Sequence, residues 1–333
     1  MRTTLVLCAA LSYLGPGCSD DASGPAQPDG AGAGADAGAG PVDGASSPID
    51  PTATGMHDYT LTTADGERHF TLHLPASYDP ARVYPLLFLL HGGDGGGSGS
   101  MTPSGADMLV NTGYGAKAEA EGFIAIAPRA LGGNWNDGRP DTDAALAGID
   151  DVAFFDAMIT AARSSLHVDP ARVFATGMSN GAMMSHRLGC ERAGVFAAIA
   201  PVSGQIPRVW LDCAPTAPVS VFEIQGAIDP LNQVGGRDHV ASSVQTATHW
   251  ATFNGCTDAA AIATIATRSD AVGPEVETYL ARGCTGGARV DFHIIKGMGH
   301  AWPPNPSIAP AISGPTSDAI DATDASWAFF AGV

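Results

Sequence analysis

The sequence is poor in positive charge, and above all in lysine. Only two lysines occur, Lys117 and Lys296, and Lys and Arg together number 16 against 34 Asp and Glu, which gives a formal net charge of −18. A nucleic-acid partner is therefore excluded, because the chain has too few cations to replace the counterions condensed on a phosphate backbone. The same shortage excludes a basic membrane-binding patch.

The apolar run near the N-terminus is short. Residues 5–14 follow Arg2 and are too few for a membrane-spanning helix, which needs about 20 apolar residues. Residues 1–18 instead predict an export signal. Cys18 at its end is placed like the lipid-acceptor cysteine of a bacterial lipoprotein, with ordinary secretory cleavage as the alternative. We therefore expect an exported protein, either a lipoprotein of the bacterial cell surface or outer membrane or an extracellular protein, with membrane contact only through that lipid.

Large apolar side chains are almost absent from the segment that follows. Residues 21–50 contain eight Ala, seven Gly, four Pro and five Asp. Such a composition cannot repay the entropy of ordering, so residues 19–55 are predicted to be a flexible acidic linker. The segment lacks the dense oxygen ligands of a calcium loop. Residues 56–333 are then predicted to form the folded domain.

Cysteine is scarce, with six residues in the chain. Cys8 lies in the signal and Cys18 at its end, and an even number remaining in an exported chain predicts two disulfides. Three pairings are possible, and we expect the sequential one because it closes the shortest loops. No close CxxC pair or Cys/His cluster is visible in the sequence, so neither a metal nor another cofactor is expected. The four remaining cysteines are Cys190, Cys213, Cys256 and Cys284.

Short apolar segments alternate with amphipathic ones over the rest of the chain. Residues 58–74 alternate apolar and polar side chains around a turn, which predicts a hairpin. Strands that alternate with helices predict an α/β fold, with a mostly parallel central sheet covered by helices on both faces. Ligands then bind beyond the carboxyl ends of the strands. The predicted strands are residues 85–90, 123–127, 172–176, 196–201, 219–224 and 289–295, and the predicted helices are residues 150–167, 182–188, 239–253 and 318–330.

Residues 177–181 have the sequence Gly-Met-Ser-Asn-Gly. They lie between the predicted strand 172–176 and the predicted helix 182–188, which is the context of a G-x-S-x-G nucleophile elbow. The motif predicts Ser179 as a nucleophile in a strained turn, with glycines where side chains would collide with neighbouring elements. The backbone N–H of Asn180, at the start of the helix, is a predicted oxyanion donor.

A serine nucleophile needs a base, and the base needs an orienting acid. Asp229 follows the predicted strand 219–224, and His300 comes directly after Gly297 and Gly299 beyond the last predicted strand. This order of nucleophile, acid and histidine is typical of α/β-hydrolases. We therefore expect Asp229 as the acid and His300 as the base. Weaker candidates for the acid are Asp238, Asp258 and Asp270.

A glycine-rich loop follows the predicted strand 85–90. Its sequence, His91-Gly92-Gly93 followed by Asp and three more glycines, resembles the HGGG-type loop that supplies a second oxyanion donor. Gly93 is the candidate donor. A phosphate-binding loop is excluded because no Gly-Lys-Ser/Thr follows.

Several segments of the chain match the motifs of one enzyme family. Residues 58–304 resemble the secreted polyhydroxybutyrate depolymerase and feruloyl esterase type of α/β-hydrolases, which is related to carbohydrate esterase family one. The usual His-Gly-Thr-x-Asp-Pro around the acid is here Gln-Gly-Ala-Ile-Asp-Pro, residues 225–230. The matching segments are residues 90–93, 135–136 with Arg139, 150–154, 177–184, 196–204, 254–256 and 299–303.

The resemblance implies roles for further residues. It implies a catalytic triad of Ser179, Asp229 and His300, and a disulfide between the two C-terminal cysteines. It also makes Trp135, Trp302 and His91 candidates for substrate contact.

The function expected from these features is that of a serine carboxylesterase that works through an acyl-enzyme intermediate. The expected partner is an ester substrate, either a polyhydroxybutyrate-type polyester or a feruloyl or acetyl ester of a plant polysaccharide. Two alternatives stay open at this point. One is a serine peptidase of the same fold, and the other is a non-catalytic, polysaccharide-binding lipoprotein on a hydrolase scaffold.

Overall fold

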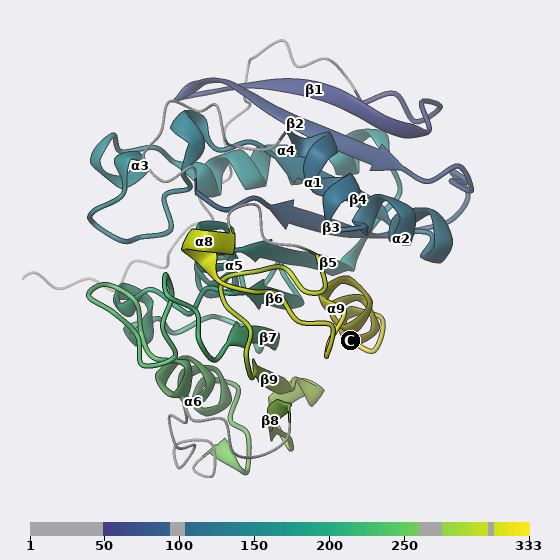
Figure 1. Ribbon diagram of the computed structural model, residues 1–333. Helices are drawn as coiled ribbons and strands as arrows, with labels where there is room; N and C mark the ends of the chain where they lie inside the picture. Colours follow the sequence, from purple (N-terminus) through teal and green to yellow (C-terminus); the bar gives the residue numbers. More distant parts are fainter. Residues whose placement is uncertain (1–48, 94–103, 260–274, 306–309) are drawn as a thin grey trace, which may run out of the picture. The chain divides into compact units, whose positions relative to one another are not determined.

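A single sheet organises the part of the chain described by the computed structural model, residues 49–93, 104–259, 275–305 and 310–333 (Figure 1). All of these residues belong to one unit, Val42–Val333. The strand order is β1-β2-β4-β3-β5-β6-β7-β9-β8. The pairs β1–β2, β2–β4 and β8–β9 are antiparallel, and the other pairs are parallel. The strands are β1 Gly55–Thr63, β2 Gly66–Leu74, β3 Tyr84–Leu90, β4 Ile124–Pro128, β5 Val168–Met178, β6 Ala198–Val202, β7 Ser220–Gly226, β8 Val276–Ala281 and β9 Val290–Ile295.

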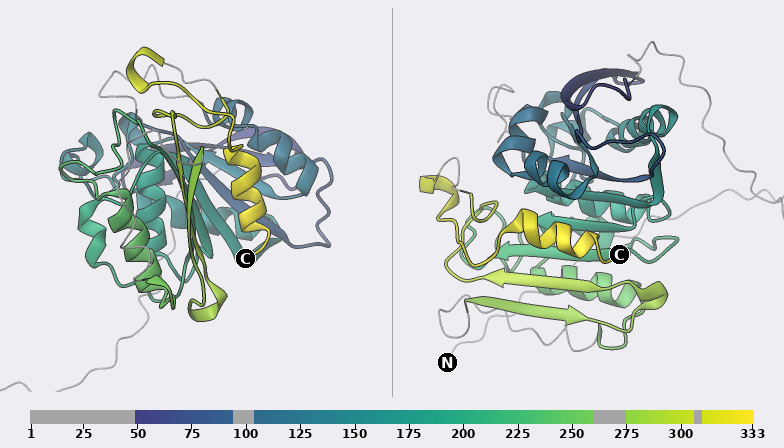
Figure 2. Two further views of the ribbon diagram at one scale, coloured as in Figure 1. Left: turned by 60° about the horizontal axis from the view of Figure 1, so that its bottom comes forward. Right: turned by 90° about the vertical axis from the view of Figure 1, so that its right-hand side faces the viewer.

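Helices cover both faces of this sheet, as the left view of Figure 2 shows. Strand β3 illustrates why: Leu86 and Phe88 belong to the core cluster that includes side chains of α4, α5 and α6, while Leu87 and Leu89 belong to the one that includes side chains of α1, α2 and α9. A strand that is apolar on every residue is stable only when both faces are covered. The helices are α1 Gly105–Asn111, α2 Tyr114–Glu121, α3 Asp143–Leu146, α4 Asp151–Ser165, α5 Asn180–Glu191, α6 Ser243–Phe253, α8 Pro310–Ser313 and α9 Ala322–Phe330.

The expected α/β architecture is confirmed, with differences at element ends. The structure contains the hairpin, the six predicted strands and the four predicted helices. Two helices begin later than expected, because Ser242 caps α6 in a reciprocal capping box with Gln245, and Asp321 caps α9. Helices α1 and α2 and the edge strand β8 were not expected, since α1 and α2 include glycines and β8 is short and partly exposed.

The segment before β1 is the end of the expected linker, residues 19–55. Its last residues are described, and Ile49 among them is buried in the core cluster that also includes Tyr59 and Phe70 of the hairpin. The expected export signal of residues 1–18, with Cys18, lies outside the described residues, as does the linker up to residue 48. In the described part of the chain, no helix has both the length and the apolar character needed to cross a bilayer.

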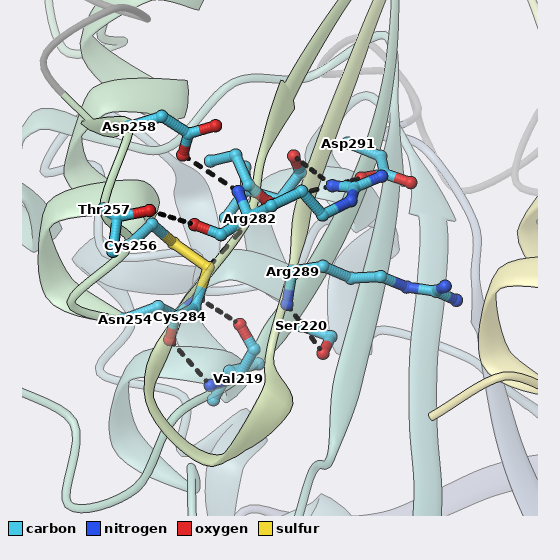
Figure 3. Close-up of a disulfide and its surroundings, with 12 residues drawn as sticks. Val219, Ser220, Asn254, Cys256, Thr257, Asp258, Arg282, Cys284, Arg289 and Asp291 are labelled. Carbon is cyan, nitrogen blue, oxygen red and sulfur yellow. Dashed lines mark hydrogen bonds and ion pairs between the residues drawn. A yellow bond between two sulfur atoms is a disulfide. The ribbon is translucent and has the colours of Figure 1, made fainter.

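Both disulfides join neighbouring segments in sequential order, as expected. One links Cys190 at the end of α5 to Cys213, and the other links Cys256 after α6 to Cys284 after β8. Figure 3 shows the second disulfide with Asn254, whose side-chain amide donates to the carbonyl oxygen of Val219 at 2.7 Å and accepts from its N–H at 3.0 Å. These contacts attach the end of α6 to the residue that precedes β7.

A buried ion pair attaches the hairpin to α4. Arg68 on β2 and Asp151 in the first turn of α4 are both essentially inaccessible to solvent, and Arg68 Nη2 lies 2.6 Å from Asp151 Oδ1. The guanidinium also lies 4.1 Å from the ring centroid of Phe154. The second oxygen of Asp151 accepts the backbone N–H of Asn136 at 2.6 Å. The pair therefore fixes both α4 and the loop that contains Asn136.

Replacement of one partner should leave the other as an uncompensated buried charge. We expect Arg68→Leu to lower the free energy of unfolding by about 3–5 kcal/mol. The double variant Arg68→Leu/Asp151→Leu should regain part of that loss, because both charges are then absent. Urea denaturation measures both values, with Arg163→Leu as the control on an exposed position of α4. Equal unfolding energies for Arg68→Leu and the wild type would contradict the assignment.

Candidate active site

The turn from β5 into α5 holds Ser179 in an unusual backbone conformation. Ser179 has φ 57° and ψ −117°, although it is not a glycine. Its N–H donates to the carbonyl oxygen of Val202 on the neighbouring strand β6 at 3.0 Å. Its side chain is half-buried, so solvent reaches it. A conformation of this kind costs about 1–3 kcal/mol and persists only where the surrounding structure enforces it.

Close approach to β3 enforces this turn. A Cβ atom on Gly177 would lie 2.7 Å from the carbonyl oxygen of Leu90, and one on Gly181 would lie 2.5 Å from the same oxygen. Both distances are shorter than real Cβ contacts, so any side chain at either position would push α5 away from the sheet. The steric requirement expected for the two glycines of the motif is therefore present in the fold.

His300 and Asp229 are hydrogen-bonded to each other. His300 Nδ1 lies 2.8 Å from Asp229 Oδ2, and both side chains are buried. The N–H groups of Leu231 and Asn232 each donate to Asp229 Oδ1 at 2.8 Å. Gln225 Nε2 donates to Asp229 Oδ2 at 3.1 Å. The carboxylate is thus held on both oxygens, and the imidazole is oriented through Nδ1.

The weaker candidates for the acid are placed differently. Asp238 is exposed, and Asp258 accepts the backbone N–H of Arg282 at 2.9 Å at the opposite end of β8 from the expected site. Asp270 lies outside the described residues. Of the acids that the structure describes, Asp229 is the one bonded to His300.

The turn after β6 connects the three loops that hold these side chains. Ser203 Oγ donates to the carbonyl oxygen of Ala301, the residue after His300, at 3.0 Å. The side-chain amide of Asn232, in the loop of the acid, donates to the carbonyl oxygen of Ser203 at 2.8 Å. A Cβ on Gly204 would lie 2.5 Å from the carbonyl oxygen of Ser179. The carboxyl ends of β5, β6, β7 and β9 therefore meet in one site, as a parallel sheet requires.

The two expected oxyanion donors lie beside each other. Asn180 is the first residue of α5, where backbone N–H groups have no acceptor within the helix. A Cβ on Gly93 would lie 3.6 Å from the Cβ of Asn180, and one on Gly92 would lie 3.4 Å from the Cβ of Ser179. The described start of the glycine-rich loop therefore runs along the turn at Ser179. Residues 94–97 of that loop lie outside the described residues.

The Asn180 side chain has a role that the sequence did not indicate. Its Oδ1 accepts the N–H of Trp135 at 2.7 Å, and its Nδ2 donates to Trp135 O at 3.0 Å and to Asp137 Oδ2 at 2.6 Å. Asp137 is fully buried and forms an ion pair with Arg139 at 2.8 Å. Nothing in the local pattern of residues 134–139 announces this contact, because its partner lies more than 40 residues away. It attaches the loop to the start of α5.

The three side chains implied as substrate contacts lie in packed positions. Trp135 is fully buried, and its Nε1 donates to the carbonyl oxygen of His91 at 3.0 Å. His91 is also fully buried; its Nε2 accepts the N–H of Ala130 at 3.0 Å, so Nδ1 carries the proton and donates to Gly92 O at 2.6 Å. Trp302 is 6% exposed, and its Nε1 donates to Thr323 Oγ1 at 3.1 Å. These hydrogen bonds hold the three side chains against the loops of the site, and a substrate contact by any of them stays a prediction.

One group of side chains has the composition of a metal site. The ligand atoms of Cys190, Cys213 and His249 lie within 4.8 Å of one another, with His249 Nε2 3.5 Å from Cys213 Sγ. The fold thus creates a Cys/His cluster that the sequence did not show. Burial lowers the pKa of His249, which keeps its ring neutral. The two sulfurs are joined in a disulfide, however, and the thiolate is the form that binds metal. The oxidised pair therefore lacks metal ligands.

Known proteins similar to this chain were found by sequence and by structure. A probable feruloyl esterase C from Aspergillus terreus is 31% identical over 268 residues, which cover 80% of this chain and 84% of that protein. A feruloyl esterase C from Emericella nidulans is 32% identical over 221 residues, which cover 65% of this chain and 72% of that protein. No family model matches the chain.

Among solved structures, an acetyl xylan esterase from Aspergillus awamori superimposes with a TM-score of 0.54 and 17% sequence identity. The superposition covers 83% of this chain and all of that one. At this identity the likeness shows a common fold.

Proposed function

Because the chain belongs to the feruloyl esterase family of α/β-hydrolases and hydrolyses carboxylic ester bonds, we propose that Ser179, His300 and Asp229 are its catalytic triad. The observation that carries this proposal is the buried hydrogen bond of 2.8 Å between His300 Nδ1 and Asp229 Oδ2. It leaves Nε2 as the imidazole nitrogen available to a serine hydroxyl. Ser179 supplies that hydroxyl at the carboxyl end of the same sheet.

The proposed reaction follows from this arrangement. His300 Nε2 takes the proton of Ser179 as its oxygen attacks the ester carbonyl, and Asp229 stabilises the imidazolium that forms. The N–H groups of Gly93 and Asn180 bind the oxyanion of the tetrahedral intermediate. His300 then protonates the departing alcohol. Water, deprotonated by the same nitrogen, hydrolyses the acyl-enzyme and regenerates Ser179.

We propose feruloyl or acetyl esters of plant polysaccharides as the substrates. The names of the relatives, feruloyl esterase C and acetyl xylan esterase, support this class, whereas no relative described above is named for a polyester. A polyhydroxybutyrate-type ester is therefore the less favoured substrate. The chain belongs to an esterase family, and no observation favours either a serine peptidase activity or a purely polysaccharide-binding role.

Export is a further part of the proposal. The two disulfides support it, because disulfides form and persist in oxidising compartments. The apolar segment before Cys18 supports an export signal, and Cys18 is the proposed site of a lipid anchor. A lipid there would hold the domain at a membrane surface through the acidic linker.

Loss of the nucleophile should abolish turnover and leave the fold intact. We expect Ser179→Ala to lower kcat for p-nitrophenyl butyrate by at least about 10⁴-fold, since the acyl-enzyme cannot form. The variant should also resist labelling by a fluorophosphonate probe. Ser164→Ala, on an exposed position of α4, is the matched control and should keep wild-type turnover. Normal turnover by Ser179→Ala would refute the triad.

Substrate class can be compared directly. We expect kcat/KM for methyl ferulate to exceed that for hydroxybutyrate oligomers by at least about 10-fold, because a buried aryl ring contributes more apolar area than a methyl branch. The rate of acetate release from acetylated xylan should also exceed the rate at which hydroxybutyrate is released from the oligomers. The Ser179→Ala variant gives the background rate for each substrate. A preference for the oligomers would overturn the proposed class.

The lipid anchor can be tested by one substitution. Cys18→Ser removes the acceptor thiol, so in a bacterial host the full-length chain should move from the membrane fraction to the soluble fraction. Cys8→Ser, within the proposed signal, is the control and should leave the distribution unchanged. Membrane association that survives Cys18→Ser would argue against lipidation at this residue.

A further inference from the structure

A carboxyl group that the proposed triad does not use lies in the middle of β7. Glu223 is fully buried, and neither of its oxygens has a hydrogen-bond partner among the described residues. His186 Nε2 on α5 lies 3.5 Å from Glu223 Oε2, and it makes no hydrogen bond of regular geometry within the described structure, although the backbone of Gly204 lies close to the ring. Buried polar atoms without partners are costly and rare in folded proteins. Their gathering at one place therefore requires an explanation.

The protonation of His186 follows from its other nitrogen. Trp250 Nε1 lies 3.1 Å from His186 Nδ1, and an indole nitrogen can only donate. Nδ1 is therefore the acceptor, and Nε2 carries the proton and faces Glu223. Burial lowers the pKa of His186 to about 3, and burial raises the pKa of Glu223 well above its usual value. Both shifts favour the neutral forms, an imidazole and a carboxylic acid, over an ion pair.

Gln225 connects this region to the acid of the site. It lies two residues after Glu223 on β7, so the two side chains extend from the same face of the sheet. Gln225 Nε2 donates to Asp229 Oδ2 at 3.1 Å and to the carbonyl oxygen of Asn232 at 2.7 Å. These two acceptors fix which end of the amide is nitrogen. The oxygen end, Oε1, then needs a donor, and none is found among the described residues.

We propose that Glu223 is a positioning residue for Asp229, and that it acts by donating its carboxyl O–H to Gln225 Oε1, directly or through a buried water molecule. This inference rests on the proposed function, because Asp229 is part of the proposed triad. Neutral Glu223 can accept from His186 Nε2 and donate toward Gln225, which satisfies the atoms left without partners. A polar, buried cluster of this kind is also where internal water binds in proteins. We call Trp250, His186, Glu223 and Gln225 the β7 polar chain.

Ionisation of Glu223 would break the β7 polar chain. A carboxylate has no proton to donate to Gln225 Oε1, and it would add a second negative charge on the face that leads to Asp229. The titratable groups on the helices over this face are His186, Arg187 and Glu191 on α5, His249 on α6, and Asp151, Asp156 and Arg163 on α4. Arg187 pairs with Glu191 at 2.9 Å, Asp151 with Arg68 at 2.6 Å and Asp156 with Arg192 at 2.8 Å. On β9, the residue beside Glu223 is Phe292, which is uncharged. The cluster therefore contains no cation to balance a carboxylate.

Two substitutions separate hydrogen bonding from packing at this position. Glu223→Gln keeps the shape and both donor and acceptor atoms, and we expect its kcat for p-nitrophenyl butyrate to stay within about twofold of the wild type. Glu223→Met keeps the length but has no donor, and its kcat should fall between about 10-fold and about 100-fold with KM unchanged, because Asp229 and His300 are then less precisely held. The same change at an exposed strand position, Glu67→Met, is the control. Wild-type kcat in Glu223→Met, or equal losses in both Glu223 variants, would overturn the inference.

A pH series tests the neutral state and needs only the conservative variant. A raised pKa in the folded state means that the folded chain binds more protons than the unfolded chain above the ordinary value of 4.5. The contribution of Glu223 to stability is therefore present below that pH and is lost as the pH rises toward the folded-state pKa. Glu223→Gln cannot ionise, so its urea midpoint should rise relative to the wild type between about pH 5 and about pH 8. A constant difference over this range would contradict the inference.

An infrared measurement keeps the inference testable if Glu223→Met fails to fold. The wild-type protein at neutral pH should show the carbonyl band of a protonated carboxylic acid, and Glu223→Gln should lack it. Absence of that band from the wild type would overturn the inference. Activity in Ser179→Ala would instead refute the proposed triad, whereas an inactive Ser179→Ala with a fully active Glu223→Met would refute the role of Glu223 alone.

Discussion

The arrangement of the site depends on how closely β5 and α5 approach the end of β3. Gly177 and Gly181 allow backbone to pack directly on the carbonyl oxygen of Leu90, and the turn between them is thereby forced into the positive-φ conformation of Ser179. A looser contact would let the turn relax, since a strained backbone conformation persists only where the surrounding structure enforces it. The same approach sets the start of α5 beside Gly93. The strain at Ser179, the position of this proposed nucleophile and the positions of the proposed oxyanion donors thus share one steric cause.

The parallel order of β5, β6, β7 and β9 converts this local turn into a site. Each of these strands ends at the same edge of the sheet, so residues 50 to 121 positions apart in the sequence come together there. The turn at Ser203 and Gly204 holds these loops in place relative to one another, because its backbone and hydroxyl contact the loops of all three proposed triad residues. Loops that share hydrogen bonds in this way cannot shift independently.

The sequence predicted best those features that depend on the spacing of residues close together in the chain. The elbow at Ser179, the glycines beside it and the strand ends before Asp229 and His300 are short-range patterns, and the fold contains each of them. Sequence patterns failed where a role depends on tertiary contacts. For Trp135 and His91 the resemblance implies substrate contact, and the fold adds that both are buried and donate to backbone, which no local pattern indicates. The Cys213–His249 contact and the Asn180–Asp137 bond join segments 36 and 43 residues apart, which no local pattern encodes.

Gln225 stands where the family pattern has a histidine, and this difference changes the hydrogen bonding around Asp229. A histidine there could change its charge, whereas a glutamine amide is neutral at every pH and has one donor end and one acceptor end. Its amide nitrogen donates to Asp229 and Asn232, so its amide oxygen, Oε1, still needs a hydrogen-bond donor. Glu223, two residues earlier on the same face, is a side chain that can meet this demand while it stays uncharged. Gln225 and Glu223 are therefore proposed to act together, with the carboxylic acid in the core supplying the donor that the glutamine beside the acid lacks.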